Sequence, residues 1–179
     1  MKKIAVCACL FMIMTAAQAS AAAMFQCSLT PDIALHDRDT RIEGVSLSIW
    51  GENEQSSFAL GLVNGFKRQS EGAALGLFNY SDGYTGFQLA GINYTNGAML
   101  GWQMGLLDYT VGTMQGIQLG FFNYAGILKG LQLGLVNYAG TTASGIQIGI
   151  VNIIPANTEW FTRFPDQIAP AMVIFNWRF

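Results

Sequence analysis

Charged residues are scarce in this chain, and the scarcity is sharpest in its second half. Between Gly86 and Asn152 only Asp108 and Lys129 carry a charge. A small soluble domain usually has about a quarter to a third of its surface residues charged, so this composition indicates a surface that meets a membrane or another protein. The chain has no run of about 18 consecutive apolar residues, which excludes a membrane-spanning helix. It also lacks a basic stripe, which argues against nucleic acid as a partner.

Cysteine and histidine are also rare, with three cysteines and one histidine. Cys7 and Cys9 lie within residues 1–19, which we interpret below as a signal peptide that is removed on export. Cys27 then has no partner for an intramolecular disulfide. Pairing with another chain stays open, but a buried or unpaired thiol is expected. The single histidine, His36, lies in a charged segment that we interpret as a solvated linker, and one histidine makes no zinc site.

Motifs for catalysis are missing as well. The sequence contains no Gly-x-Ser-x-Gly elbow and no glycine loop followed by Lys-Ser or Lys-Thr. It therefore predicts no catalytic, metal-binding or cofactor-binding residue, no cofactor, and a protein that is not an enzyme.

The N-terminus has the pattern of a secretory signal peptide. A pair of lysines precedes an apolar run over residues 4–14, and an Ala-Gln-Ala cleavage pattern ends at Ala19. The run is too short to span a membrane as a helix. We expect residues 1–19 to be removed on export and residues 20–179 to form one domain. A buried N-terminal helix is the alternative interpretation.

What the chain has in abundance is one repeated phrase: Gly, apolar, usually Gln, apolar, Gly or Ala, two apolar residues, Asn or Asp. Clear copies start at Gly86, Gly101, Gly116, Gly130 and Gly145, and a looser copy starts at Gly72. The starting glycines step by 14, 15, 15, 14 and 15 residues. A fixed short period means that one small unit is used many times, here over about residues 58–152.

Each copy alternates with a period of two, which predicts one half-buried strand per repeat. In the copy that starts at Gly116, the apolar residues Ile117 and Leu119 share a face with Asn123, and Gln118 shares the other face with Tyr124. Strict alternation thus places the tyrosines in the interior with the glutamines. A bulge at the paired apolar residues would move them outside.

We predict an all-β fold, an antiparallel meander that closes into a small β-barrel of about 8–10 strands. Turn-like pairs such as Asn96-Gly97 favour tight hairpins between the strands. The alternative is a β-solenoid of 14–15-residue repeats, in which the glutamines stack as a ladder. The single-residue slips count against the solenoid, because it must absorb each slip with a bulge.

The C-terminal part departs from the repeat. Residues 171–179 predict a last strand that ends on an aromatic residue. This strand resembles the closing strand of bacterial outer-membrane barrels, with an ordinary buried strand as the alternative. The long connection over residues 153–170 contains a candidate interaction loop with Trp160, Phe161 and Phe164. A lid that packs on its own barrel is the other interpretation of this segment.

The repeated amides are predicted to have structural roles, the asparagines by bonding turn backbones. These positions are Gln88, Gln103, Gln118, Gln132, Gln147, Asn93, Asp108, Asn123, Asn137 and Asn152. Asp108 replaces an Asn of the repeat, so a hydrogen-bonding role is favoured over a ligand-binding carboxylate.

The segment GLQLGLVNYAG at residues 130–140 resembles the bacterial surface-repeat proteins first described in leptospires, which are built from GLQ[LI]GL[VLI]N units. The resemblance covers nearly all of the mature chain, and Ala59, Ala74 and Asp108 depart from the pattern. It implies a secreted or surface location and no reaction.

We therefore expect a non-catalytic bacterial outer-membrane or cell-surface protein with a structural or interaction role. The expected partner is a membrane, either the outer leaflet or the outer membrane, and a protein or glycan partner stays open. The alternative is a soluble or surface-attached β-solenoid binding module of the adhesin type, in the periplasm or secreted.

Overall fold

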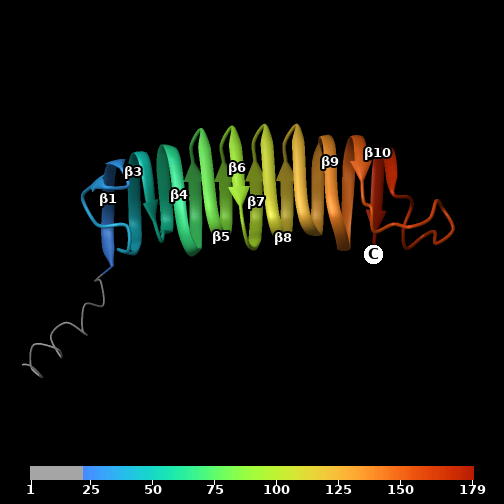
Figure 1. Ribbon diagram of the computed structural model, residues 1–179, viewed down its shortest axis with the longest axis horizontal. Coiled ribbons are helices and arrows are strands. Elements are labelled where there is room, and N and C mark those ends of the chain that lie inside the picture. The colour runs from blue at the N-terminus through green and yellow to red at the C-terminus, as the bar shows by residue number, and fades with distance from the viewer. Residues whose placement is uncertain (1–21) are drawn as a thin grey trace, which may run out of the picture.

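Residues 22–179 form a rod of stacked β-coils in the computed structural model (Figure 1). The rod is a β-solenoid of about seven turns, and this part of the chain contains strands and no helix. Accordingly, no helix there is long and apolar enough to cross a membrane. The all-β prediction is confirmed. The predicted signal peptide, with Cys7 and Cys9, lies outside the described residues.

Ten strands build the coils, and the longest ones bend around corners and continue. They are β1 (Ala23–Thr30), β2 (Ile33–Ala34), β3 (Ile42–Asn53), β4 (Ser56–Leu75), β5 (Phe78–Leu89), β6 (Ile92–Thr95), β7 (Met99–Met104), β8 (Leu107–Leu119), β9 (Phe122–Ile153) and β10 (Ala171–Arg178). The single long strand β9 contains two copies of the repeat, which start at Gly130 and Gly145.

Neighbouring repeats pair in parallel, so the prediction of an antiparallel barrel was wrong and the solenoid alternative is correct. Gly101 of β7 lies opposite Gly116 of β8, and Gln103 lies opposite Gln118. The sheet follows an open path from β10 to β2 and does not close into a ring. Parallel neighbours need a connection that returns to the start of the strand, and here the remainder of the same coil provides it.

The 14- and 15-residue steps are reconciled at one corner of the coil. Strands β4 and β5 pair with a step of 15 at Phe66 and Ser81 but with a step of 14 at Gln69 and Gly83. Strands β8 and β9 change step in the same way after Thr110. A one-residue bulge at this corner leaves the rest of the coil in register. The slips therefore do not oppose a solenoid.

A second, tighter corner lies between the Gln and the Asn of each repeat and reverses the alternation. Gln118 is buried, the consecutive Phe121 and Phe122 are 55% and 53% exposed, and Asn123 is buried again. Because two consecutive residues point outward, every later residue lies on the opposite side of the coil wall from the one that strict alternation predicts. The tyrosine after each Asn therefore points outward, as the alternative with broken alternation at the paired apolar residues requires.

The backbone requires the leading glycine of the repeats that start at Gly72, Gly86, Gly101, Gly116 and Gly130, all of which have a positive φ, whereas Gly145 does not. Gly116 has a φ of +135°, and a Cβ at this position would lie 2.0 Å from the carbonyl oxygen of Gly101. Glycine adopts such a φ without the steric cost that other residues meet. The same residue thus provides both the bend and the close approach of successive coils.

Each end of the rod has a covering segment. At the N-terminal end, β1 pairs in parallel with β3, and the short β2 folds back antiparallel to β1. At the other end, β10 pairs antiparallel with the last coil of β9, with Phe175 opposite Ile148. The loop before β10 pairs in turn with the outer edge of this strand, where the Phe179 N–H donates to the Asp166 carbonyl oxygen at 2.9 Å, so further strands cannot pair there. The predicted last strand is present, but it covers the end of the rod and closes no barrel.

Candidate functional site

The interior of the coil contains two ladders of amide side chains. In the first, Gln103, Gln118, Gln132 and Gln147 each donate a hydrogen bond from Nε2 to Oε1 of the glutamine one turn earlier, at 2.7–3.0 Å. These residues and Gln88 are fully buried. A buried amide is costly unless it is hydrogen-bonded, and the stack gives each glutamine its partner.

The second ladder consists of the asparagines and runs in the opposite direction. Asn64, Asn79, Asn93, Asn123 and Asn137 each donate from Nδ2 to Oδ1 of the residue one turn later, at 2.8–3.0 Å. Asn93 also donates to the backbone carbonyl oxygen of Met104 at 3.0 Å. The asparagines therefore join successive coils through one another and through the backbone of the following coil.

Asp108 interrupts the asparagine ladder. Its Oδ1 accepts a hydrogen bond from Asn93, but its Oδ2 and the Oδ1 of Asn123 are both buried without a partner. These two oxygens lie 3.1 Å and 2.9 Å from the point that a Cβ on Gly120 would occupy.

Burial raises the pKa of Asp108 to about 7, against the hydrogen bonds from Asn93 and from the backbone of Leu119. A proton on Oδ2 can be donated to Asn123 and completes the ladder. The neutral acid thus replaces the asparagine as a hydrogen-bond donor. The carboxylate has no proton to donate, so Asp108 Oδ2 and Asn123 Oδ1 are then both acceptors without a donor.

The first coils fill the interior differently. Ala59 and Ala74 occupy the glutamine column, and the ring of Phe66 packs against Tyr84 with centroids 4.9 Å apart. The glutamine ladder begins only at Gln88. The two alanines leave room for the aromatic rings at this end, and a buried apolar column continues from Tyr84 through Met99, Met114 and Leu128 along the rod.

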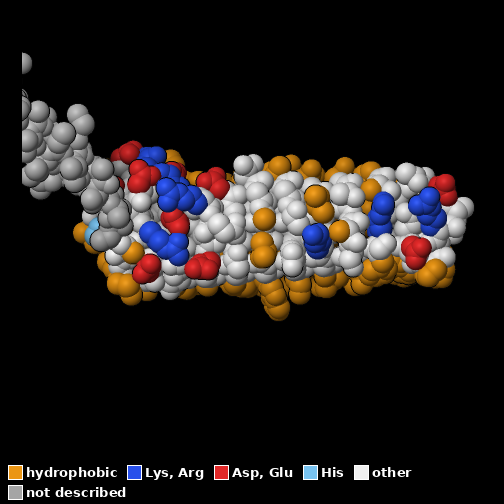
Figure 2. All heavy atoms as spheres, turned by 90° about the horizontal axis from the view of Figure 1, so that it is seen from below, with side chains coloured by type: hydrophobic (Ala, Val, Ile, Leu, Met, Phe, Trp, Pro, Cys, Tyr) orange, Lys and Arg blue, Asp and Glu red, His pale blue; other side chains and the backbone are white. Residues whose placement is uncertain are grey.

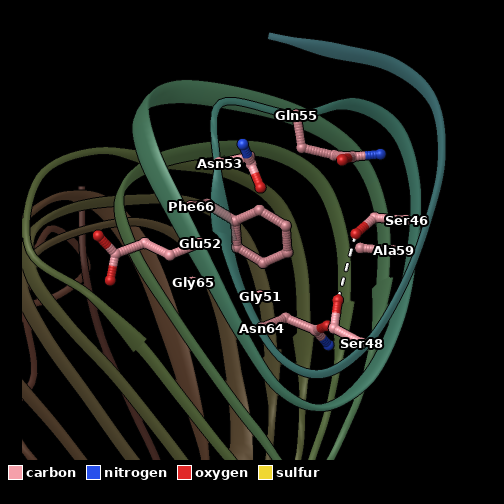
Figure 3. Close-up of a pocket in the computed structure, with 10 residues that line it drawn as sticks. All are labelled: Ser46, Ser48, Gly51, Glu52, Asn53, Gln55, Ala59, Asn64, Gly65 and Phe66. Carbon is pink, nitrogen blue, oxygen red and sulfur yellow. Dashed lines mark hydrogen bonds between the residues drawn. The ribbon is translucent and has the colours of Figure 1, made fainter. Parts of the chain in front are cut away.

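A cavity lies inside these first coils. Figure 3 shows its ten lining residues, with Phe66 pointing inward between Asn53 and Asn64 while Glu52 points away. The volume open to a water-sized sphere is about 10 Å³, which is room for about one water molecule. The cavity is too small to hold a substrate.

The charged residues of segment 31–71 form a network on the surface of the first coils. Its ion pairs include Arg38–Asp32, Arg41–Glu54, Arg68–Glu54 and Lys67–Asp39. His36 exchanges backbone hydrogen bonds with the side chain of Gln26. Exposed ion pairs contribute only about 0–1 kcal/mol each, so this network serves solubility more than stability.

Cys27 is a free thiol, as one of the predicted alternatives requires, and it is exposed rather than buried. Within residues 22–179, no group of three or more His, Cys, Asp or Glu side chains is arranged to hold a metal ion.

The outside of the coil carries the apolar side chains. The tight corner contributes a corner row of Leu62, Leu77, Leu106, Phe121, Leu135 and Ile150, each 45–65% exposed, which Gly91 interrupts between Leu77 and Leu106. On the Gln side, outward residues alternate with the buried glutamines: Phe87, Leu89, Trp102, Met104, Ile117, Leu119, Leu131, Leu133, Ile146 and Ile148. On the Asn side a row consists of Phe78, Ile92, Leu107, Phe122, Val136 and Val151. These rows together are named the apolar wedge.

An aromatic row borders the apolar wedge on the Asn side. There, Tyr94, Tyr109, Tyr124 and Tyr138 stack with centroids 4.2–5.7 Å apart and with ring planes 3–9° from parallel. On the Gln side, the border row is mainly aliphatic, and Trp102, which is 49% exposed, lies in it between Phe87 and Ile117. Such rings have an apolar body and a polar tip.

The remaining side of the coil is polar. This polar arc comprises residues 67–71, 82–85, 96–100, 112–115, 126–129 and 140–144, with Leu100 and Ile127 as its partly exposed apolar exceptions. Figure 2 shows one face of the rod on which polar and charged atoms run along the middle and hydrophobic side chains line both long margins. The charged side chains gather there over the first coils and the far end.

The predicted interaction loop lies at the C-terminal end of the rod. Trp160, Phe161 and Phe164 are 58%, 56% and 64% exposed. Trp160 lines an apolar hollow together with Val151 and Val173. The three aromatic side chains therefore continue the apolar surface at the end of the wedge, while Ile154, Ile168 and Ala169 of the same segment are buried and cover the end of the interior.

No protein-family model, no curated protein and no solved structure matches this chain. Its candidate site must therefore be judged by its own geometry. Sequence reasoning placed the amides and the aromatic loop but missed the corner row. The signal for that row was the pair of consecutive apolar residues between each Gln and Asn.

Proposed function

We propose that this chain is a non-catalytic, exported bacterial surface protein that acts by contact. The observation that carries the proposal is the distribution of side chains in the repeats, with two ladders of buried amides inside the coil and rows of exposed apolar residues outside. Continuous exposed apolar surfaces larger than a few hundred Å² mark sites of interaction with proteins or membranes. The solenoid is then a rigid support that presents the apolar wedge, and it needs no cofactor.

Two features of the sequence support the location. Residues 1–19 have the pattern of a secretory signal. The repeat units resemble those of leptospiral-type surface proteins. The outer membrane or the cell surface is therefore the proposed site of action.

A second candidate is a soluble or surface-attached binding module of the adhesin type, in the periplasm or secreted. The observation that favours it is the exposed aromatic loop with Trp160, Phe161 and Phe164 at one end of the rod. Aromatic side chains dominate the binding energy of many protein interfaces, and a protein or a glycan would be the partner.

Cell fractionation tests the proposal. The chain, expressed in a bacterium with an outer membrane, is expected to lose residues 1–19 and to be cleaved by protease added to intact cells. A periplasmic protein serves as the control that must stay uncleaved. Retention of the full-length chain in the cytoplasm would overturn the proposal, and a soluble protein in the periplasm or medium would favour the second candidate.

A further inference from the structure

The shape of the apolar wedge points to its partner. We propose that the solenoid binds a lipid surface by lying in one leaflet of a membrane, with the apolar wedge among the acyl chains and the polar arc in water. The rod axis then runs parallel to the membrane plane. This inference rests on the proposed function and names its partner.

The wedge is convex, and this favours a fluid partner. Its two arms, on the Gln side and the Asn side, meet at the corner row, where Leu77 and Ile150 are 65% and 64% exposed. A rigid protein surface could cover both arms only if it had a matching cleft. Acyl chains fill the space on both sides of an edge without one.

The size of each arm argues against a second copy as partner. The distance from Phe121 at the corner to Tyr124 at the border is three residues, or about 10 Å. Seven turns at about 4.8 Å give a rod of about 34 Å. One arm thus covers roughly 340 Å² in projection, whereas a stable interface needs about 800 Å² from each partner. A dimer through one arm would also leave the other arm in water.

The border rows match the depth of a membrane interface. Tyrosine and tryptophan concentrate where hydrocarbon meets headgroups, because each has an apolar ring and a polar tip. The stack from Tyr94 to Tyr138 borders one arm, and the border row of the other arm contains one such residue, Trp102. An insertion of about 10 Å stays within one leaflet of a hydrocarbon core about 30 Å thick.

The charged residues lie outside the apolar wedge, as the proposed orientation requires. Between Gly72 and Asn152, the exposed charged residues Asp82 and Lys129 belong to the polar arc, and Asp108 is buried inside the coil. Immersion of this part of the wedge therefore places no charged side chain in hydrocarbon.

Flotation with phosphatidylethanolamine–phosphatidylglycerol vesicles tests the proposal with the full chain. The unmodified protein is expected to float with the vesicles. Glutamates on the corner row, in a Leu106→Glu, Phe121→Glu, Leu135→Glu variant, are expected to lower the partition coefficient at least about a hundredfold, since each buried side chain of this size contributes about a factor of ten. The matched control, Asn96→Glu, Gln115→Glu, Ser144→Glu, adds the same charge on the polar arc and should keep binding within a few-fold.

A depth measurement gives a second, independent readout that needs no charged variant. In a chain with Cys7, Cys9 and Cys27 replaced by serine, a bimane label is placed by Phe121→Cys on the corner row or by Ser144→Cys on the polar arc. Nitroxides in the acyl chains are expected to quench the label at 121 and to spare the label at 144. Equal quenching at both positions would overturn the proposed orientation.

The outcomes separate this inference from the proposed function. A protein that reaches the cell surface but neither floats nor is quenched refutes the lipid partner and leaves the surface role standing. A vesicle-independent dimer that the corner-row glutamates dissociate assigns the wedge to a second copy and also refutes the lipid partner. Retention in the cytoplasm contradicts the proposed function, whatever the vesicles show.

Discussion

The inside of this solenoid is unusually rich in amides, and its outside is unusually rich in exposed apolar side chains. The interior of the repeats contains two ladders of buried glutamines and asparagines beside an apolar column with Tyr84, Met99, Met114 and Leu128, and the exterior carries rows of leucine, isoleucine, phenylalanine and valine. In most domains apolar burial dominates the favourable free energy of folding. Here the inward side chains have a different task, which is to align each coil with the next.

The amide ladders explain how the register is held. Every interior Gln and Asn needs a partner at its own height on the neighbouring coil, so a shifted coil leaves buried amides without hydrogen bonds. An aliphatic interior has no such directional demand. The exterior rows are therefore free to meet another apolar phase, because the alignment of the coils does not depend on them.

The largest expected effect on stability comes from Asp108, the carboxylic acid that occupies an asparagine position in the buried ladder. The folded state raises the pKa of Asp108 from 3.8 to about 7, mainly by burial. The folded chain thus holds a proton that the unfolded chain releases, so stability is greatest below about pH 4 and falls as pH rises to about 7. At pH 8 we expect Asp108→Asn to be more stable than the unmodified protein by about 2–4 kcal/mol.

Urea unfolding at several pH values checks this expectation. At pH 4 the two proteins should differ by less than about 1 kcal/mol, because a neutral acid and an amide make similar hydrogen bonds. Asn123→Asp places a second acid beside the first and serves as a control that should deepen the pH dependence. A constant difference across the range would contradict the assigned pKa.

The next effect tests the amide ladder itself. Gln118→Leu keeps a similar volume but removes the hydrogen bonds to Gln103 and Gln132 and leaves their amides partly unsatisfied. We expect a loss of about 2–3 kcal/mol in the free energy of unfolding. Urea denaturation measures it, and a gain in stability would show that the interior behaves as an ordinary apolar core.

The sequence predicted the strands better than their topology. The sequence predicts a last strand over residues 171–179, and the structure has β10 there. Alternation is the same for parallel and antiparallel neighbours, however, so it does not separate a solenoid from a barrel. The single-residue slips favour the barrel only if each of them disturbs the register of a solenoid.

Two patterns contained the missing information. The spacing from Gln to Asn is always five residues, as in Gln118 and Asn123, while the spacing from Asn to the next Gln varies between nine and ten. All slips therefore lie in one arc of the coil. The consecutive Phe121 and Phe122 marked the tight corner that turns the tyrosines outward. The partnerless oxygen of Asp108, in contrast, depends on side-chain positions that no spacing reveals.

A smaller effect is expected from the tyrosine stack, which is the most ordered part of the outside. Tyr109 lies between Tyr94 and Tyr124 and forms two ring pairs, whereas Tyr138 forms one. Each aromatic pair contributes about 0.5–1.5 kcal/mol. Tyr109→Ala should therefore destabilise the protein about twice as much as Tyr138→Ala in urea unfolding. Equal losses would mean that stacking along the row adds nothing beyond local packing.

The smallest effect on stability is expected from the reverse substitution, leucine to glutamine, on the outside of the coil. Leu135 is 45% exposed on the corner row, so Leu135→Gln should change the free energy of unfolding in lipid-free buffer by less than about 0.5 kcal/mol. The opposite exchange at Gln118 is expected to cost several times more. If urea unfolding gives equal losses for the two variants, the corner row packs as a core would, and the contrast between inside and outside fails. If Leu135→Gln leaves the free energy of unfolding unchanged but weakens vesicle binding, folding and binding depend on different residues. The interior then stabilises the fold, and the exterior binds the partner.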